Sequence, residues 1–146
     1  MSTRDEIDKL LEFSSAFDYG HDNDREIAIV GCAYIESLVK AILTESLIQD
    51  EKELESLLDE GRGALPGLVQ RARILYLMGK MPKVIFSDVK LIARVRNHFA
   101  HNVSASFSDY EVVKNINRLQ WYIEAMLGRI APEGATPREI YQVAIN

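Results

Sequence analysis

Three side chains suited to acid–base and phosphate chemistry occur within six residues, at Arg96, Asn97 and His101. A histidine titrates near neutral pH and can move the proton of a 2′-hydroxyl, while an arginine stabilises the negative charge that develops. With an amide beside them, such groups can hold a phosphodiester and cleave RNA without a metal ion. On a continuous helix, however, Arg96 and His101 diverge by about 140°. They can meet if the helix ends near Ala100, or if two chains bring their motifs together at an interface.

Arg96 also fits a structural interpretation, because it falls on the apolar side of the helix expected around it. At ~100° per residue, a helix over residues 82–100 has a polar face and an opposite apolar stripe that includes Arg96. A buried guanidinium needs a carboxylate partner or a ligand anion. Glu36, which follows the uncharged stretch 27–35, is the candidate partner. A buried Glu36–Arg96 ion pair would fix the register of two helices without any activity, so both interpretations stay open.

The net charge of −5 hides an uneven distribution of charged residues. Residues 1–60 contain five lysines and arginines against sixteen aspartates and glutamates, whereas residues 70–101 contain seven basic residues and a single acidic one. The acidic balance argues against a dedicated DNA-binding protein, because duplex affinity comes largely from cationic contacts to phosphates. The two halves can attract each other within the fold, or the basic stretch can recruit RNA. The basic patch expected from this stretch comprises Arg71, Arg73, Lys83, Lys90 and Arg94.

The sequence indicates a soluble, cytoplasmic protein with no membrane segment. Its N-terminus is charged and lacks the apolar segment of a signal peptide, and no uninterrupted apolar run approaches the ~20 residues that span a bilayer. Cys32 is the single cysteine, so no intramolecular disulfide can form. We find no glycine pattern of a nucleotide-binding loop and no third ligand beside His98 and His101 for zinc, so we expect no cofactor and no metal.

Helix punctuation predicts an all-α fold, an antiparallel helical bundle of about six helices in a single domain over residues 1–146. Capping boxes are expected at Thr3, Ser108 and Thr136, and Gly79 is expected to end a helix. No useful stretch alternates with period two, so we predict no strands. The uncharged stretch 27–35 predicts a central helix buried on all sides. Helices are expected over about 3–19, 25–48, 68–78, 82–100, 108–130 and from 136, with a short helix or loop over 50–60.

Several segments together resemble the mannitol operon repressor (MltR) family. Residues 96–101, Arg-Asn-His-Phe-Ala-His, are similar to the R-N-x-F-A-H signature of that family. Segments 24–28, 33–38 and 71–79 fit the family pattern in the same order, so the resemblance covers about residues 22–127. It implies an all-helical bacterial regulator with no obvious DNA-reading module. The residues agree, because no helix-turn-helix signal with a basic recognition helix is present.

The same signature also resembles the R-x4–6-H motif of the wider HEPN superfamily. Residues 35–40 are similar to the second helix of that superfamily. Its active members are dimeric, metal-independent endoribonucleases whose arginine and histidine meet at the dimer cleft, which implicates Arg96, Asn97 and His101. Many HEPN-like domains only bind nucleotides or partners, and kinship of fold does not establish activity.

The leading hypothesis is therefore an MltR-like transcriptional regulator that acts through a protein partner. We expect a homodimer, because twofold pairing is the commonest oligomeric state, and we expect no specific binding to DNA. The alternative hypothesis is a HEPN-type endoribonuclease that binds RNA and uses Arg96 and His101.

Overall fold

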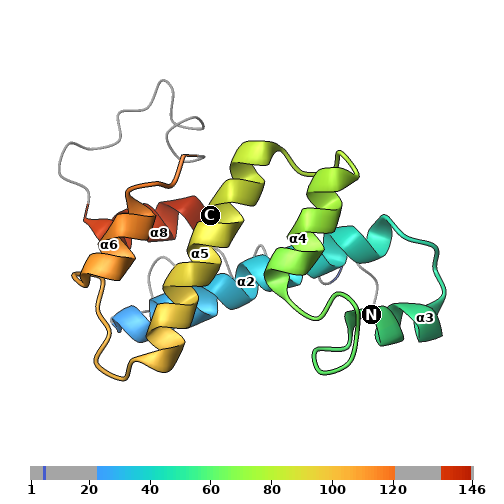
Figure 1. Cartoon of the computed structure of the whole chain (residues 1–146), viewed down its shortest axis with the longest axis horizontal. Helices are drawn as coiled ribbons and strands as arrows, with labels where there is room; N and C mark the ends of the chain where they lie inside the picture. The colour runs from blue at the N-terminus through green and yellow to red at the C-terminus, as the bar shows by residue number, and fades with distance from the viewer. Residues whose placement is uncertain (1–4, 6–22, 121–135, 146) are drawn as a thin grey trace.

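The computed structural model describes residue 5, residues 23–120 and residues 136–145. These parts form six α-helices and no strand, which confirms the predicted all-α helical bundle (Figure 1). Apart from residue 5, the helix predicted over residues 3–19 lies outside the described residues. In chain order the helices are α2 (Asp24–Glu45), α3 (Glu51–Leu58), α4 (Leu68–Leu77), α5 (Lys83–His101), α6 (Tyr110–Ile116) and α8 (Pro137–Ile145).

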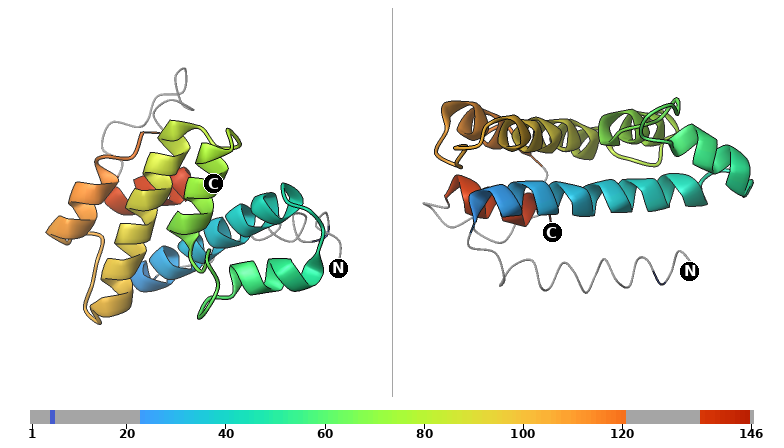
Figure 2. Two further views of the ribbon diagram at one scale, coloured as in Figure 1. Left: turned by 45° about the vertical axis from the view of Figure 1, so that its right-hand side comes forward. Right: turned by 90° about the horizontal axis from the view of Figure 1, so that it is seen from below.

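The described helices lie in two layers. Helices α4, α5 and α6 form one layer, and α2 and α8 form the other, as the right-hand view of Figure 2 shows. Helix α5 contacts α4 on one side, α6 on the other and α2 beneath it. The signature residues 96–101 therefore belong to the helix that packs against three of the other described helices.

Helix α2 is the longest described helix and contributes many of the buried core residues. Asn23 caps it by accepting hydrogen bonds from the main-chain N–H groups of Arg25 (2.8 Å) and Glu26 (3.4 Å). Ile27 and Cys32 are almost fully buried, but Ala33 is exposed, so burial on all sides was wrong. The helices that contact α2 leave part of its circumference uncovered. By length and composition α2 would also suit a membrane span, but the core helix of a soluble protein has the same properties, and α2 packs against α4, α5 and α8.

A glycine turn sets α5 beside α4. Gly79 has φ +72°, a left-handed conformation that suits glycine. Its N–H donates to the carbonyl of Tyr76 (3.0 Å), and the N–H of Lys80 donates to the carbonyl of Leu75 (2.8 Å). This pair of bonds is the Schellman ending, and it confirms the predicted helix end at Gly79. Tyr76 then stacks on Phe86 of α5, with ring centroids 5.1 Å apart.

The helix predicted over 108–130 was wrong in its length. Helix α6 ends at Ile116; residues 117–118 form a turn, and residues 119–120 continue without helical structure. The cause is the buried carboxylate of Asp88 on α5, which accepts hydrogen bonds from the N–H of Gln120 at 3.0 and 3.2 Å. That contact holds the chain away from a straight continuation of α6. Residues 121–130 of the predicted helix lie outside the described residues.

The two expected capping boxes within the described residues had different outcomes. At the last helix, the N–H of Thr136 donates to the Glu139 carboxylate (2.9 Å) and the N–H of Glu139 donates to the Thr136 hydroxyl (3.3 Å), which confirms that box. The box at Ser108 was wrong, because Asp109 occupies the cap position of α6 and makes no capping bond there. The Asp109 carboxylate is bound to other groups, described below.

Candidate functional site

Arg96 and His101 do not share a site within one chain. Helix α5 continues through His101, so the expected break near Ala100 is absent and the two side chains stay on different sides of the helix. Arg96 is half-buried and donates a hydrogen bond from Nη1 to Oδ1 of Asn97 (3.2 Å), while the His101 side chain is exposed. No hydrogen bond among the described residues joins His101 to either of the other two. Their use as a catalytic set therefore depends on a second chain.

Arg96 lies at the contact between α2 and α5 rather than in bulk solvent. The pKa of the Cys32 thiol is raised to about 12, chiefly by burial and also by the Glu36 carboxylate, while the Arg96 guanidinium opposes both. Glu36 and Arg96 are thus both within electrostatic reach of this thiol. Within the described part of the chain, however, no ion pair within 4 Å joins Glu36 to Arg96. The two charges face the same buried group without the direct contact that the sequence analysis expected.

Phe99 has a clear structural role in the signature. Its side chain is fully buried and packs against Phe107, with ring centroids 5.0 Å apart. The Phe99 carbonyl accepts a hydrogen bond from Arg25 Nη1 at 2.6 Å, which satisfies a carbonyl in the last turn of α5. The neighbouring Asp24 carboxylate accepts from the N–H of Phe107 (3.1 Å) and pairs with Arg138 (3.4 Å). Segment 24–28 therefore holds the end of α5 to the α5–α6 connection and to α8.

Arg71 does not belong to the expected basic patch. It is only 5% exposed, and its guanidinium donates to the carbonyls of Leu58 (2.7 Å), Leu65 (2.9 Å) and Pro66 (3.4 Å). Arg71 is therefore a buried residue whose hydrogen bonds hold the loop before α4 in place.

The other members of the patch do not form a uniform cationic surface. Arg73, Lys83 and Arg94 are exposed, whereas Lys90 is half-buried. The Lys90 amine lies 4.6 Å above the Phe86 ring, and the Arg73 guanidinium lies 5.9 Å from the same ring. Two of the cations therefore cover an aromatic side chain.

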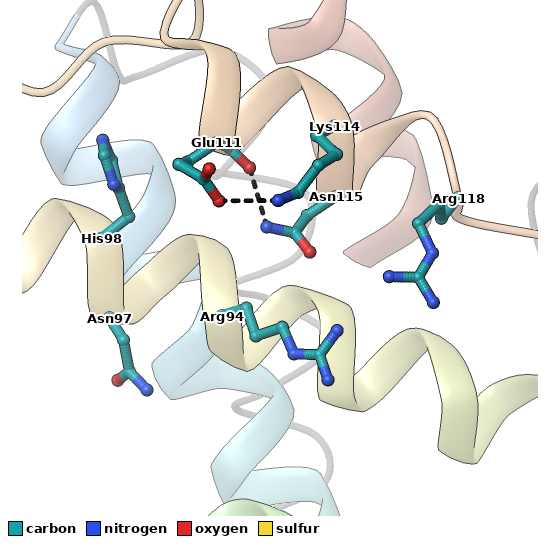
Figure 3. Close-up of a pocket in the computed structure, with 7 residues that line it drawn as sticks. All are labelled: Arg94, Asn97, His98, Glu111, Lys114, Asn115 and Arg118. Atoms are coloured by element: carbon teal, nitrogen blue, oxygen red, sulfur yellow. Dashed lines mark hydrogen bonds and ion pairs between the residues drawn. The ribbon is translucent and has the colours of Figure 1, made fainter.

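A polar pocket of about 430 Å³ opens between the C-terminal half of α5 and the α6 segment (Figure 3). Its α5 side consists of one turn of side chains, and its other side comes from α6 and the turn after it. The pocket brings together three cations, one carboxylate, two amides and an imidazole. The lining residues are Arg94, Asn97, His98, Glu111, Lys114, Asn115 and Arg118.

Three of these polar groups, Lys114, Glu111 and His98, are paired. Lys114 Nζ lies 3.0 Å from the Glu111 carboxylate, and His98 Nε2 lies 2.9 Å from the Asp109 carboxylate. The hydrogen bond from His98 lowers the pKa of Asp109, and a second hydrogen bond, from the N–H of Ser106 at 3.0 Å, lowers it further. Asp109 thus ties α5 to the loop before α6.

The pocket shares only Arg94 and Asn97 with the residues that the sequence analysis selected. His98 was weighed as a metal ligand, and the α6 contribution was missed because that segment was treated as an apolar helix. A signal was present, since Glu111, Lys114, Asn115 and Arg118 follow one another at the i, i+3, i+4, i+7 spacing of a single helical face.

Comparison with known proteins identifies one family. A family model described as "Mannitol repressor" matches residues 20–143. This match confirms the resemblance drawn from residues 22–127 and extends it to almost the whole of α8. No curated protein and no solved structure matches the chain.

Proposed function

Because this chain belongs to the mannitol repressor family, we propose that it represses transcription in the cytoplasm by contacting a protein partner rather than by reading DNA. The family match supports the regulatory role. The position of α5 inside a layer of helices supports the choice of a protein partner, and it is the observation that carries the proposal.

The position of α5 within its layer supports a mode of action other than that of a recognition helix. A recognition helix enters a major groove about 12 Å wide and is itself about 10–12 Å across with its side chains, so it must protrude from the protein. Helix α5, which carries Lys83, Lys90 and Arg94, is flanked by α4 on one side and α6 on the other (Figure 1). Its neighbours would meet the DNA backbone before its side chains reached the bases.

The charges of α3 and α2 also disfavour DNA. Helix α3 stands at the edge of the molecule (Figure 2) and carries exposed Glu51, Glu53 and Glu55. These carboxylates would repel phosphates. Helix α2 has acidic residues in its first turn and no basic residue in its last turn. A protein partner is compatible with both features, since its surface can supply matching charges.

An exposed apolar pair at the end of α4 is a suitable contact point for that partner. Leu77 is 71% exposed and Met78 is 40% exposed, and both precede the turn at Gly79. Apolar side chains presented on a fixed helix end contribute to binding when a partner removes them from water.

The proposal is tested by measuring repression from the mannitol-operon promoter in cells that carry variants of the chain. Leu77→Asp is expected to weaken partner binding by about tenfold or more and to relieve repression, because it places a charge in an apolar contact. The matched control is Val103→Asp. Val103 is 95% exposed and follows the C-terminal end of α5, whereas Leu77 precedes its N-terminal end. Lys83→Ala should repress like wild type. Loss of repression in Lys83→Ala, with full repression by Leu77→Asp, would contradict the proposal.

A further inference from the structure

We propose that the pocket between α5 and α6 binds a small phosphate monoester, which Arg94 and Arg118 hold through its phosphate group. This inference goes beyond the proposed function, because it assigns a ligand site that repression through a protein partner does not require.

The charges that line the pocket leave two cations unneutralised. The Glu111 carboxylate neutralises Lys114 at 3.0 Å. Among the residues that the structure describes, neither Arg94 nor Arg118 has a carboxylate within 4 Å. The pocket therefore presents a net excess of two permanent positive charges. A phosphate monoester carries close to two negative charges at pH 7, so it matches this excess better than a monocarboxylate does.

The geometry brings these two cations together from separate elements. In Figure 3 the guanidinium groups of Arg94, from α5, and Arg118, from the turn after α6, lie toward the same side of the pocket. A guanidinium presents a planar fork of N–H donors that fits phosphate oxygens. Two such forks on facing elements can hold one phosphate between them.

The rest of the pocket suits a hydroxyl-bearing body attached to that phosphate. Asn115 donates a hydrogen bond from Nδ2 to the carbonyl of Glu111 (2.7 Å), which fixes the amide and leaves its Oδ1 toward the arginines as an acceptor (Figure 3). A volume of about 430 Å³ lies in the range of small-molecule sites. It exceeds what a bare phosphate ion fills, which leaves room for the organic part of an ester.

Calorimetric titration of the full chain tests this assignment with four probes. The probes are inorganic phosphate, mannitol, mannitol 1-phosphate and a ten-nucleotide oligouridine, the sugar being chosen from the family description. We expect the ester to bind more tightly than inorganic phosphate and free mannitol to bind not at all. Each of Arg94→Gln and Arg118→Gln should weaken ester binding by about tenfold or more, since each removes charge-assisted hydrogen bonds.

The matched control is Lys83→Gln, which removes an exposed cation from the same helix outside the pocket and should bind the ester like wild type. Circular dichroism of each variant checks that its fold is intact, which is expected because all three side chains are exposed. Equal affinity for inorganic phosphate and the ester would overturn the assignment to an ester. Tighter binding of oligouridine would overturn it in favour of RNA. Absence of binding by every probe, or equal weakening in Lys83→Gln, would overturn the site itself.

Discussion

Replacing Arg71 with methionine should destabilise the protein strongly, although the residue looks like one more surface cation in the sequence. The side chain is 5% exposed and makes two short hydrogen bonds, to Leu58 (2.7 Å) and Leu65 (2.9 Å), with a longer one to Pro66 (3.4 Å). Methionine would occupy much of the same space but leave these carbonyls without their donor. Each hydrogen bond from a charged donor contributes about 1.5–3 kcal/mol, and the buried apolar volume of methionine offsets part of the loss. The net cost should be about 2–4 kcal/mol.

Urea unfolding followed by circular dichroism measures this cost. With a slope of about 2 kcal/mol per molar urea, Arg71→Met should lower the unfolding midpoint by about 1–2 M. The control is Arg73→Met on the same helix, because Arg73 is exposed and its guanidinium only covers the Phe86 ring from 5.9 Å. That variant should lose at most about 1 kcal/mol. Equal losses of unfolding free energy in the two variants would refute the structural role that we assign to the Arg71 hydrogen bonds.

Three further predictions concern buried or paired side chains. Tyr141→Phe should cost about 1–2 kcal/mol in urea unfolding, because it removes a fully buried hydrogen bond of 2.8 Å to the Ala28 carbonyl. Native Cys32, whose pKa is raised to about 12, should resist iodoacetamide at pH 8. Its contribution to stability should fall between pH 9 and 12 by up to about 1.4 kcal/mol per pH unit, because only the unfolded thiol ionises there; rapid native alkylation would contradict its burial. The pKa of Asp109 is lowered, chiefly by its hydrogen bond with His98. This pairing therefore stabilises the native state at pH values above the ordinary aspartate pKa near 4, and the stabilisation is lost as the pH falls below that value. Asp109→Asn should therefore show a weaker loss of stability in acid than wild type, and identical acid profiles would refute this role.

Local signals predicted the helices well where the helix ends depend on nearby residues. Gly79 and the Thr136–Glu139 box act through hydrogen bonds within a few residues, so their positions can be predicted from the sequence. The end of α6 could not, because it depends on the Asp88 carboxylate, which binds the N–H of Gln120, 32 residues further along the chain. A buried carboxylate that binds a distant main-chain N–H leaves no local pattern.

The candidate site was predictable only in part, for a related reason. Helical periodicity placed Arg94 and Asn97 on the polar face of α5, and the structure puts both at the pocket. Whether a cationic side chain is accessible to a ligand depends on the segments that pack over it. Helical periodicity alone does not show these segments. Arg71 and Arg94 look alike in the sequence, yet carbonyl groups of a loop enclose one and the other lines an open pocket.

The most direct test of repression without DNA reading is a fluorescence anisotropy titration of mannitol-operon promoter DNA with the purified chain. The same titration is made with a scrambled duplex of equal length at 50 and 200 mM salt. We predict no preference for the promoter at either concentration, with any weak binding at 50 mM salt lost at 200 mM. Binding to the promoter at least a thousandfold tighter than to the scrambled duplex, and weakened by Lys83→Ala, would contradict the account.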